Sequence, residues 1–192
     1  MRYLHASAFA LLGVLAAGCY AAPSPNNFSA LAGPARTGDL PTLQRLLAAG
    51  GNPNIMDPGG NHWTPLLHAI HKSQPAAVDL LLRSGADPRL AVNGLQPLLM
   101  AVGTGDAQIV RRLLEAGADP RADDEIFLTA VSGGALSDLD NPLLGRCNTD
   151  VVKALRQRAP DLRLPRGPRG HIAVIFARLN HCNDVVSLAA IQ

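Results

Sequence analysis

The stretch LLRSGADP at residues 81–88 decides the fold, because it recurs along the chain. It returns as LLEAGADP at residues 113–120 and, more loosely, as LLAAGGNP at residues 46–53. The glycines of the three copies, Gly50, Gly85 and Gly117, are 35 and 32 residues apart. A fixed period of this length is typical of repeat architectures, in which each repeat is one supersecondary unit.

Between these copies lie three related segments that predict the first helix of each unit. They are TPLLHA at residues 64–69, QPLLMA at 96–101 and, weakly, EIFLTA at 125–130. Thr64 can cap a helix, and Pro65 then occupies the first helical position, where its missing N–H costs nothing. Val78, Leu81 and Leu82 follow at helical spacing, and Gly85 predicts the end of a second helix.

The period and both motifs resemble the ankyrin repeat, a turn followed by two antiparallel helices. The resemblance covers residues 28–192 and implies an all-α ankyrin-repeat solenoid of about five helix-turn-helix units, with divergent terminal units. The alternative all-α fold is a compact bundle, which does not explain the periodic Gly-Ala-Asp-Pro. The expected units are 28–57, 58–90, 91–121, 122–163 with an insertion at 135–146, and 164–192.

The divergent units carry more detailed expectations. The opening helix of the first unit is expected to be interrupted by Gly33 and Pro34, and the second helix of the fourth unit to include residues 150–155. The fifth unit is expected to form helices over 171–177 and 184–190 as an atypical cap. Leucines 67, 99 and 128 replace the histidine of the family motif, so His68 does not inherit that residue's role.

The N-terminal segment predicts export. Arg2 and His5 precede an apolar run over 8–17 that is too short to span a bilayer. The run ends in LAAGC at residues 15–19, which resembles the lipobox of bacterial lipoproteins and implies a signal peptide over 1–18 and lipid on Cys19. Residues 19–27 then form a tether, and Tyr20 favours the outer membrane. We therefore expect a lipid-anchored periplasmic protein; ordinary secretion is the alternative.

Composition and charge exclude two classes of protein. Hydrophobic residues make up 47% of the chain and charged residues 17%, which excludes an intrinsically disordered protein. A net charge of +2 argues against a dedicated nucleic-acid binder. The part from Leu143 onward carries eight Lys and Arg against three Asp, a net charge of +5. This basic end meets anionic lipid or an acidic partner, or it is a solvated outer face.

No residue pattern predicts catalysis, a metal site or a cofactor, so we do not expect an enzyme. His62, His68 and His71 lie close in sequence, and His68 and His71 are three apart on one predicted helix, a spacing that can place two imidazoles over one metal. No third strong ligand accompanies that pair, so we interpret the three histidines as one turn residue and two helix-surface residues. His181 and Cys182 are adjacent, whereas a thiolate–imidazole pair needs facing geometry. The acidic run 123–125 is interpreted as a solvated turn before a helix.

Cys147 and Cys182 are predicted to form a disulfide. With Cys19 lipidated, two cysteines remain, an even number for an oxidising compartment. Aligned on the repeat, they fall at equivalent inter-helix turns of the fourth and fifth units, so a bridge would join these units. The alternative is two buried free cysteines.

The resemblance implies a protein partner bound by a monomer through the concave face, which is made from the turn tips and the ends of the first helices. The predicted contact residues are Asn61, His62, Trp63, His71, Lys72, Asn93, Leu95, Gly103, Thr104, Asp123, Asp124 and Ser132. Trp63 is the strongest candidate, either as a binding hot spot or as support for the stack. The function implied is a protein interaction module in the envelope; the alternative is an immunity lipoprotein that neutralises an antibacterial lipase or wall hydrolase.

Overall fold

The structure, a computed structural model, describes residues 28–133 and 147–189. Several predicted features lie outside these residues: the signal peptide, Cys19, the tether and the insertion at 135–146. Within them the chain forms ten helices and no strand, apart from an isolated bridge between Val92 and Leu95. The helices are α1 (Ala32–Thr37), α2 (Leu40–Ala48), α3 (Pro65–His71), α4 (Pro75–Arg83), α5 (Pro97–Thr104), α6 (Ala107–Glu115), α7 (Asp124–Ser132), α8 (Thr149–Arg158), α9 (Pro168–Leu179) and α10 (Asn183–Ala189).

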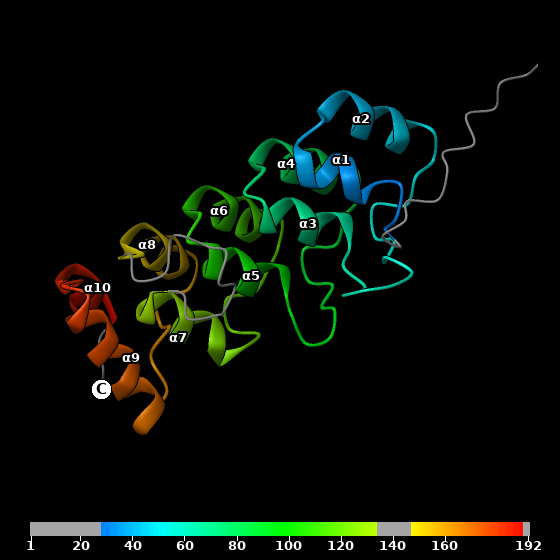
Figure 1. The fold of residues 1–192 in the computed structure, drawn as a ribbon. Coiled ribbons are helices and arrows are strands. Elements are labelled where there is room, and N and C mark those ends of the chain that lie inside the picture. The colour runs from blue at the N-terminus through cyan, green and yellow to red at the C-terminus, as the bar shows by residue number, and fades with distance from the viewer. Residues whose placement is uncertain (1–27, 134–146, 190–192) are drawn as a thin grey trace, which may run out of the picture.

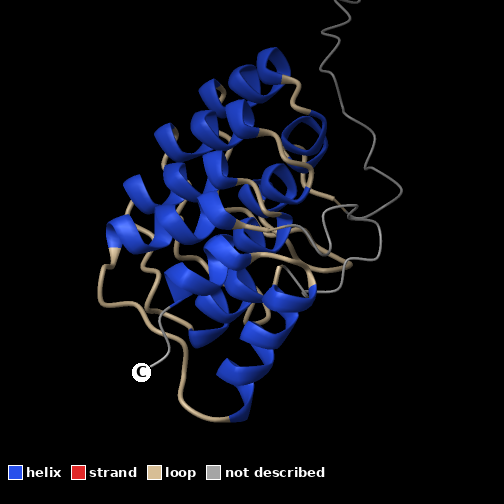
Figure 2. Ribbon diagram, turned by 90° about the vertical axis from the view of Figure 1, so that its left-hand side faces the viewer, coloured by secondary structure: helices blue, strands red, loops and turns tan. Residues whose placement is uncertain are grey.

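The helices stack in two parallel rows. The inner row runs α1, α3, α5, α7, α9, and each of these helices contacts the next in the row. The outer row runs α2, α4, α6, α8, α10 in the same way (Figure 1). The turned view shows the same stacking of short helices joined by loops (Figure 2). The fold is therefore a solenoid of five helical pairs, in which each pair packs mainly on its neighbours.

The repeated sequence elements set where these helices begin and end. The Thr64 hydroxyl accepts a hydrogen bond from the Leu67 amide at 3.3 Å, and Pro65 is the first residue of α3. Gly85 and Gly117 follow the ends of α4 and α6 with φ of 91° and 102°. This left-handed conformation favours glycine, so the Gly-Ala-Asp-Pro motif reverses the chain at the same point of the second and third units.

Aspartates cap other helices in the stack. Asp39 accepts a hydrogen bond from the Thr42 amide at 3.2 Å, and Asp106 accepts one from the Ile109 amide at 3.1 Å. The side chain of Thr42, followed by its backbone amide, lowers the pKa of the Asp39 carboxyl below its usual value. Each carboxylate satisfies amides that have no partner within the helix, and its negative charge favours the helix N-terminus.

A continuous apolar core runs along the stack between the two rows. Its largest buried side chains come from every pair of helices except the last: Leu43, Leu66, Ile70, Leu81, Leu98, Ile109, Leu113, Phe127 and Leu155. Polar contacts tie neighbouring turns together, since Asn54 accepts from the Asp87 amide at 2.8 Å and donates to the Gly85 carbonyl at 3.0 Å. Burial between neighbouring units therefore adds to the packing within each helical pair, and both contribute to stability.

The structure corrects one expectation on the first unit and adjusts two others. The prediction that Gly33 and Pro34 interrupt the first helix is wrong, because α1 runs through both residues. Pro34 lies in the first turn, where a backbone N–H has no helical partner to lose. In the later units the helices are longer than expected: α8 extends to Arg158, and α9 begins at Pro168.

Candidate functional site

A buried polar cluster lies beneath the turn that precedes α3. Asp57 is 2% exposed, and its Oδ2 lies 2.6 Å from Nε2 of His68, which is 4% exposed. Its Oδ1 accepts a hydrogen bond from the Ser29 amide at 2.7 Å, and its carbonyl oxygen lies 3.0 Å from Nδ1 of His62. One carboxylate thus joins the start of the first unit to the turn and helix of the second.

Aromatic rings surround this cluster. The His68 ring meets Phe28 edge to face at a centroid distance of 5.3 Å and Trp63 at 5.4 Å. Trp63 also meets the His71 ring at 5.1 Å. The interpretation of His68 as a helix-surface residue is wrong, because two rings and a carboxylate cover it. Trp63 is partly buried against the core, so part of its ring supports the turn and the rest faces solvent.

The predicted contact residues divide into three groups by exposure. Five are exposed: Asn61, His62, Lys72, Asn93 and Asp124. Six are partly buried: Trp63, His71, Leu95, Gly103, Asp123 and Ser132. Thr104 is 6% exposed and its hydroxyl donates to the Ala101 carbonyl at 2.9 Å. Its assignment as a contact residue is therefore wrong, because the hydroxyl is used inside α5.

The turn tips of the second and third units lie side by side. The Asn93 side chain donates to the Asn61 carbonyl at 3.4 Å, which joins residues 32 positions apart. His62 and Asn93 both have positive φ, at 56° and 51°, a conformation that few residues other than glycine adopt. These strained tips project exposed polar groups beside Trp63.

A pocket of about 160 Å³ lies between the turn that precedes α7 and the segment that follows α8. Its lining is mixed in charge and has Phe127 among its residues: Pro120, Arg121, Asp123, Asp124, Phe127, Asp161, Leu162 and Arg163. The Arg121 guanidinium hydrogen-bonds both carboxylate oxygens of Asp161 across the gap. This contact lowers the pKa of Asp161 and raises that of Arg121. Asp123 and Asp124, both predicted from sequence, therefore share a pocket with Arg121, Arg163, Asp161 and Phe127, an arrangement that sequence reasoning missed.

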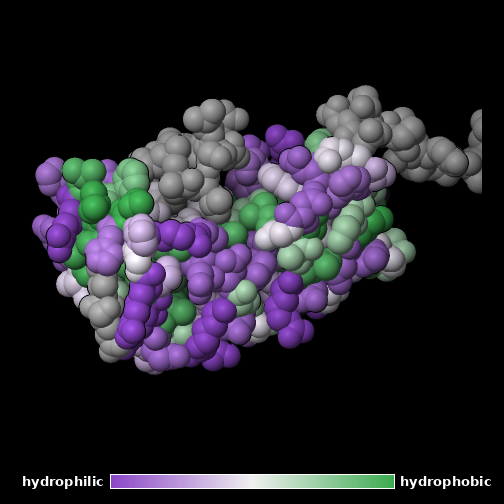
Figure 3. All heavy atoms as spheres, turned by 90° about the horizontal axis from the view of Figure 1, so that it is seen from below, coloured by the Kyte–Doolittle hydropathy of each residue, from purple (hydrophilic) through white to green (hydrophobic). Residues whose placement is uncertain are grey.

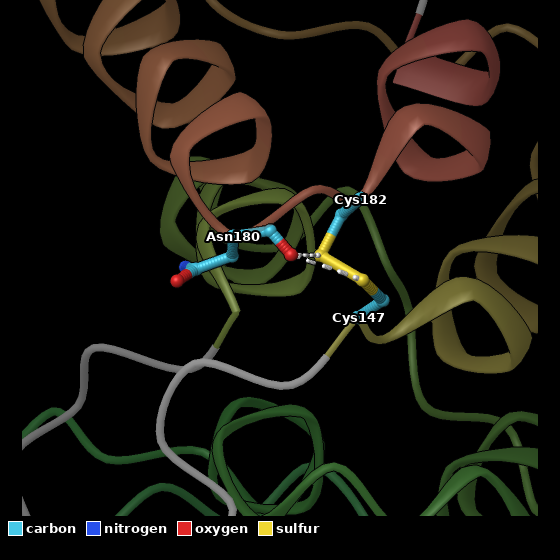
Figure 4. Close-up of a disulfide and its surroundings, with 3 residues drawn as sticks. All are labelled: Cys147, Asn180 and Cys182. Atoms are coloured by element: carbon cyan, nitrogen blue, oxygen red, sulfur yellow. Dashed lines mark hydrogen bonds between the residues drawn. A yellow bond between two sulfur atoms is a disulfide. The ribbon is translucent and has the colours of Figure 1, made fainter.

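A disulfide joins the last two units. Cys147 and Cys182 are bonded, with their Cα atoms 5.2 Å apart, and the bridge links the segment before α8 to the turn between α9 and α10. Figure 4 shows the Asn180 carbonyl oxygen beside the bridge, 3.5 Å from Sγ of Cys182. Cys147 is exposed and Cys182 is buried, so the bond connects the surface to the inside of the terminal unit.

The described residues offer no centre for metal chemistry. No group of three or more His, Cys, Asp or Glu residues among them is placed to hold a metal ion. His68 is instead engaged with Asp57, and Asp123 caps α7 by accepting from the Glu125 amide at 2.9 Å. In residues 28–133 and 147–189, no helix is both long and apolar enough to cross a membrane.

The buried Asp57 was missed by sequence reasoning. It lies in an irregular stretch between the motifs, and its partners His68 and Ser29 are 11 and 28 residues away. The one available signal was the displacement of the histidine to position 68, which placed an imidazole at an unfamiliar point of the repeat.

Comparisons with known proteins agree with this geometry. The family model described as "Ankyrin repeats (3 copies)" matches residues 31–124. The crystal structure of the human ASB11 ankyrin repeat domain superimposes with a TM-score of 0.65 at 25% identity, covering 85% of this chain and 70% of that one. A segment of 52 residues is 46% identical to the 2-5A-dependent ribonuclease of Homo sapiens, but this match covers only 27% of the chain and 7% of the ribonuclease.

The ribonuclease match is too short to carry that enzyme's activity to this chain. The ankyrin fold is typically a non-catalytic scaffold for binding other proteins. The family match and the stacked helical pairs lead to one conclusion: residues 31–124 match ankyrin repeats, and the described part of the chain folds as an all-helical ankyrin-repeat solenoid.

Proposed function

We propose that this protein is an interaction module that binds a protein partner through its turn tips and the ends of its inner helices. One observation carries the proposal: Asn61 and Asn93, from consecutive turns, are joined by a hydrogen bond while both remain exposed. The helices behind these tips are committed to the core. Such a surface offers a partner preformed hydrogen-bonding groups around a partly exposed tryptophan, at little cost in ordering.

Replacing Trp63 with alanine tests this surface. We expect the binding free energy for the partner to become less favourable by about 2 kcal/mol or more, because a tryptophan at the centre of an interface is a common hot spot. Trp63→Phe keeps an aromatic ring against His68 and His71, so it should fold normally and lose less affinity. Affinity is measured by titration calorimetry with a partner obtained from a pull-down.

Two controls separate binding from folding. Arg111→Ala changes an exposed residue on the outer helix α6 and should leave the affinity unchanged. Thermal melting is recorded for every variant. An intact affinity in Trp63→Ala, or a large fall in melting temperature that accounts for the lost binding, would show that Trp63 only supports the stack.

We also propose that the solenoid is anchored to the outer membrane from the periplasmic side by lipid on Cys19. The support is the sequence LAAGC at residues 15–19 and the unpatterned tether that follows. Cys19→Ser should move the protein from the membrane fraction to the soluble fraction, because it removes the thiol that carries the lipid. Membrane association equal to that of the parent, together with a parent mass that contains no lipid, would contradict the anchor.

We propose two classes of partner. One is an envelope protein that the anchored solenoid holds; the other is an antibacterial lipase or wall hydrolase that it neutralises as an immunity protein. Identification of the pulled-down partner separates them. Only an immunity protein should protect cells from that partner when the partner is directed to the periplasm, and Trp63→Ala should weaken the protection.

A further inference from the structure

The last inner helix, α9, exposes a stripe of large apolar side chains. Ile172, Ile175, Phe176 and Leu179 are 50%, 53%, 50% and 69% exposed. Their spacing places them on one face of the helix, while Ala173, Val174 and Ala177 on the other face are buried. Figure 3 shows apolar atoms gathered at the left-hand end of the molecule, where Figure 1 places α9 and α10.

The stripe occupies positions that other inner helices bury. Ile175 stands at the same distance before its outer helix as Leu67 and Leu99 do in the second and third units. Leu67 is 0% and Leu99 is 6% exposed, whereas Ile175 is 53% exposed. The difference arises because α3 and α5 each have an inner helix on both sides, whereas α9 contacts only α7 in that row. A repeat whose face is not covered by a further repeat normally presents polar residues there, and α9 does not.

The sequence that contains the stripe is basic. Between Asp161 and Asp184 the chain contains four arginines, no Asp and no Glu; the arginines are Arg163, Arg166, Arg169 and Arg178. Arg169 pairs with Glu125 on α7. Arg166 and Arg178 are exposed and have no carboxylate partner among the described residues. A ligand that covers the stripe therefore gains from negative charge along its edges.

We propose that α9 docks an amphipathic helix of a partner protein, with an apolar face on the stripe and carboxylates opposite Arg166 and Arg178. A helix fits because every other inner helix of the stack is covered by a helix at this place, and because the stripe is one helix wide. The adjacent helix α10 exposes Asn183, Asp184 and Ser187, and an exposed carboxylate on the neighbouring helix disfavours an anionic membrane as the occupant. A second copy of this chain would set arginines against arginines.

This docking site does not depend on the turn-tip surface proposed above. The two lie on different parts of the molecule, and they are tested by different variants. Trp63→Ala should leave helix docking on α9 intact, so failure of either proposal is distinguishable from failure of the other.

The test titrates the purified protein with two synthetic helical peptides of about four turns. Both carry the same leucine face, and one has glutamates along its borders where the other has lysines. We expect the glutamate peptide to shift the amide NMR signals of α9 selectively and to bind about tenfold tighter than the lysine peptide. Leu179→Asp should weaken binding of the glutamate peptide by at least about tenfold, because the variant would bury a charge in the contact.

A matched variant controls for nonspecific hydrophobic binding of the peptides. Ile55 is an apolar residue that is 41% exposed at the other end of the stack, so Ile55→Asp should leave peptide binding unchanged. Arg178→Glu should reverse the preference for the glutamate peptide without lowering the melting temperature. Equal binding of the two peptides, or an equal loss in Ile55→Asp, would overturn the proposal.

The remaining occupants give different results. Vesicles of phosphatidylglycerol that bind the protein through Leu179, with neither peptide binding, would assign the stripe to a membrane instead. A dimer in sedimentation that Leu179→Asp dissociates would assign it to a second copy. Either outcome contradicts a partner helix.

Discussion

Loss of the disulfide should lower the free energy of unfolding by about 3 to 4 kcal/mol, because the bridge closes a loop whose ends are 35 residues apart. The double variant Cys147→Ser, Cys182→Ser removes it. At roughly 2 to 4 °C per kcal/mol, the melting temperature should fall by roughly 10 °C. The terminal unit α9–α10 should lose hydrogen-exchange protection first, since repeats are stabilised by neighbours and α9 has an inner helix on one side only.

Two measurements check this expectation. The parent protein, once reduced and kept under reductant, should have the same melting temperature as the double variant, because both lack the same crosslink. The native parent should resist alkylation in the absence of reductant. Alkylation of Cys147 and Cys182 under those conditions would contradict a stabilising bridge. So would equal melting temperatures of the oxidised and the reduced parent.

Replacing Asp57 with alanine should destabilise the protein by about 3 kcal/mol. The variant leaves the Ser29 amide and the buried His68 ring without the carboxylate that each contacts. Hydrogen exchange should rise in α1 and α3, because Asp57 joins the segment before α1 to the helix that carries His68. Asp57→Asn should lose less stability, since its amide oxygen can still accept from Ser29.

Asp106 provides the comparison for Asp57. Its carboxylate also accepts backbone amides, from Gln108 and Ile109, but it is only partly buried and caps a single helix. Asp106→Ala should therefore cost only about 1 kcal/mol, the usual value for an N-cap. Equal losses in the two alanine variants, measured by urea unfolding, would show that the buried contacts of Asp57 add nothing to those of an ordinary cap.

The candidate surface illustrates which residues could be predicted. Asn61, His62 and Asn93 lie at turn tips because the period places the irregular stretches between helical pairs. The same reasoning is wrong for Thr104, because its hydroxyl donates a hydrogen bond to the Ala101 carbonyl within its own helix. Such local side-chain bonds compete with outward presentation and leave no mark on the repeat pattern.

The sequence by itself determined the class of fold, the number of helical pairs and most helix ends. Those depend on caps, prolines and glycines whose partners lie within a few residues, as Thr64 and Leu67 do. Only the tertiary structure decided that Asp57 meets His68, that Arg121 meets Asp161 and that the face of α9 is exposed. These outcomes depend on which unit lies against which, so they link residues as far as 40 positions apart and are not encoded in any one stretch of sequence.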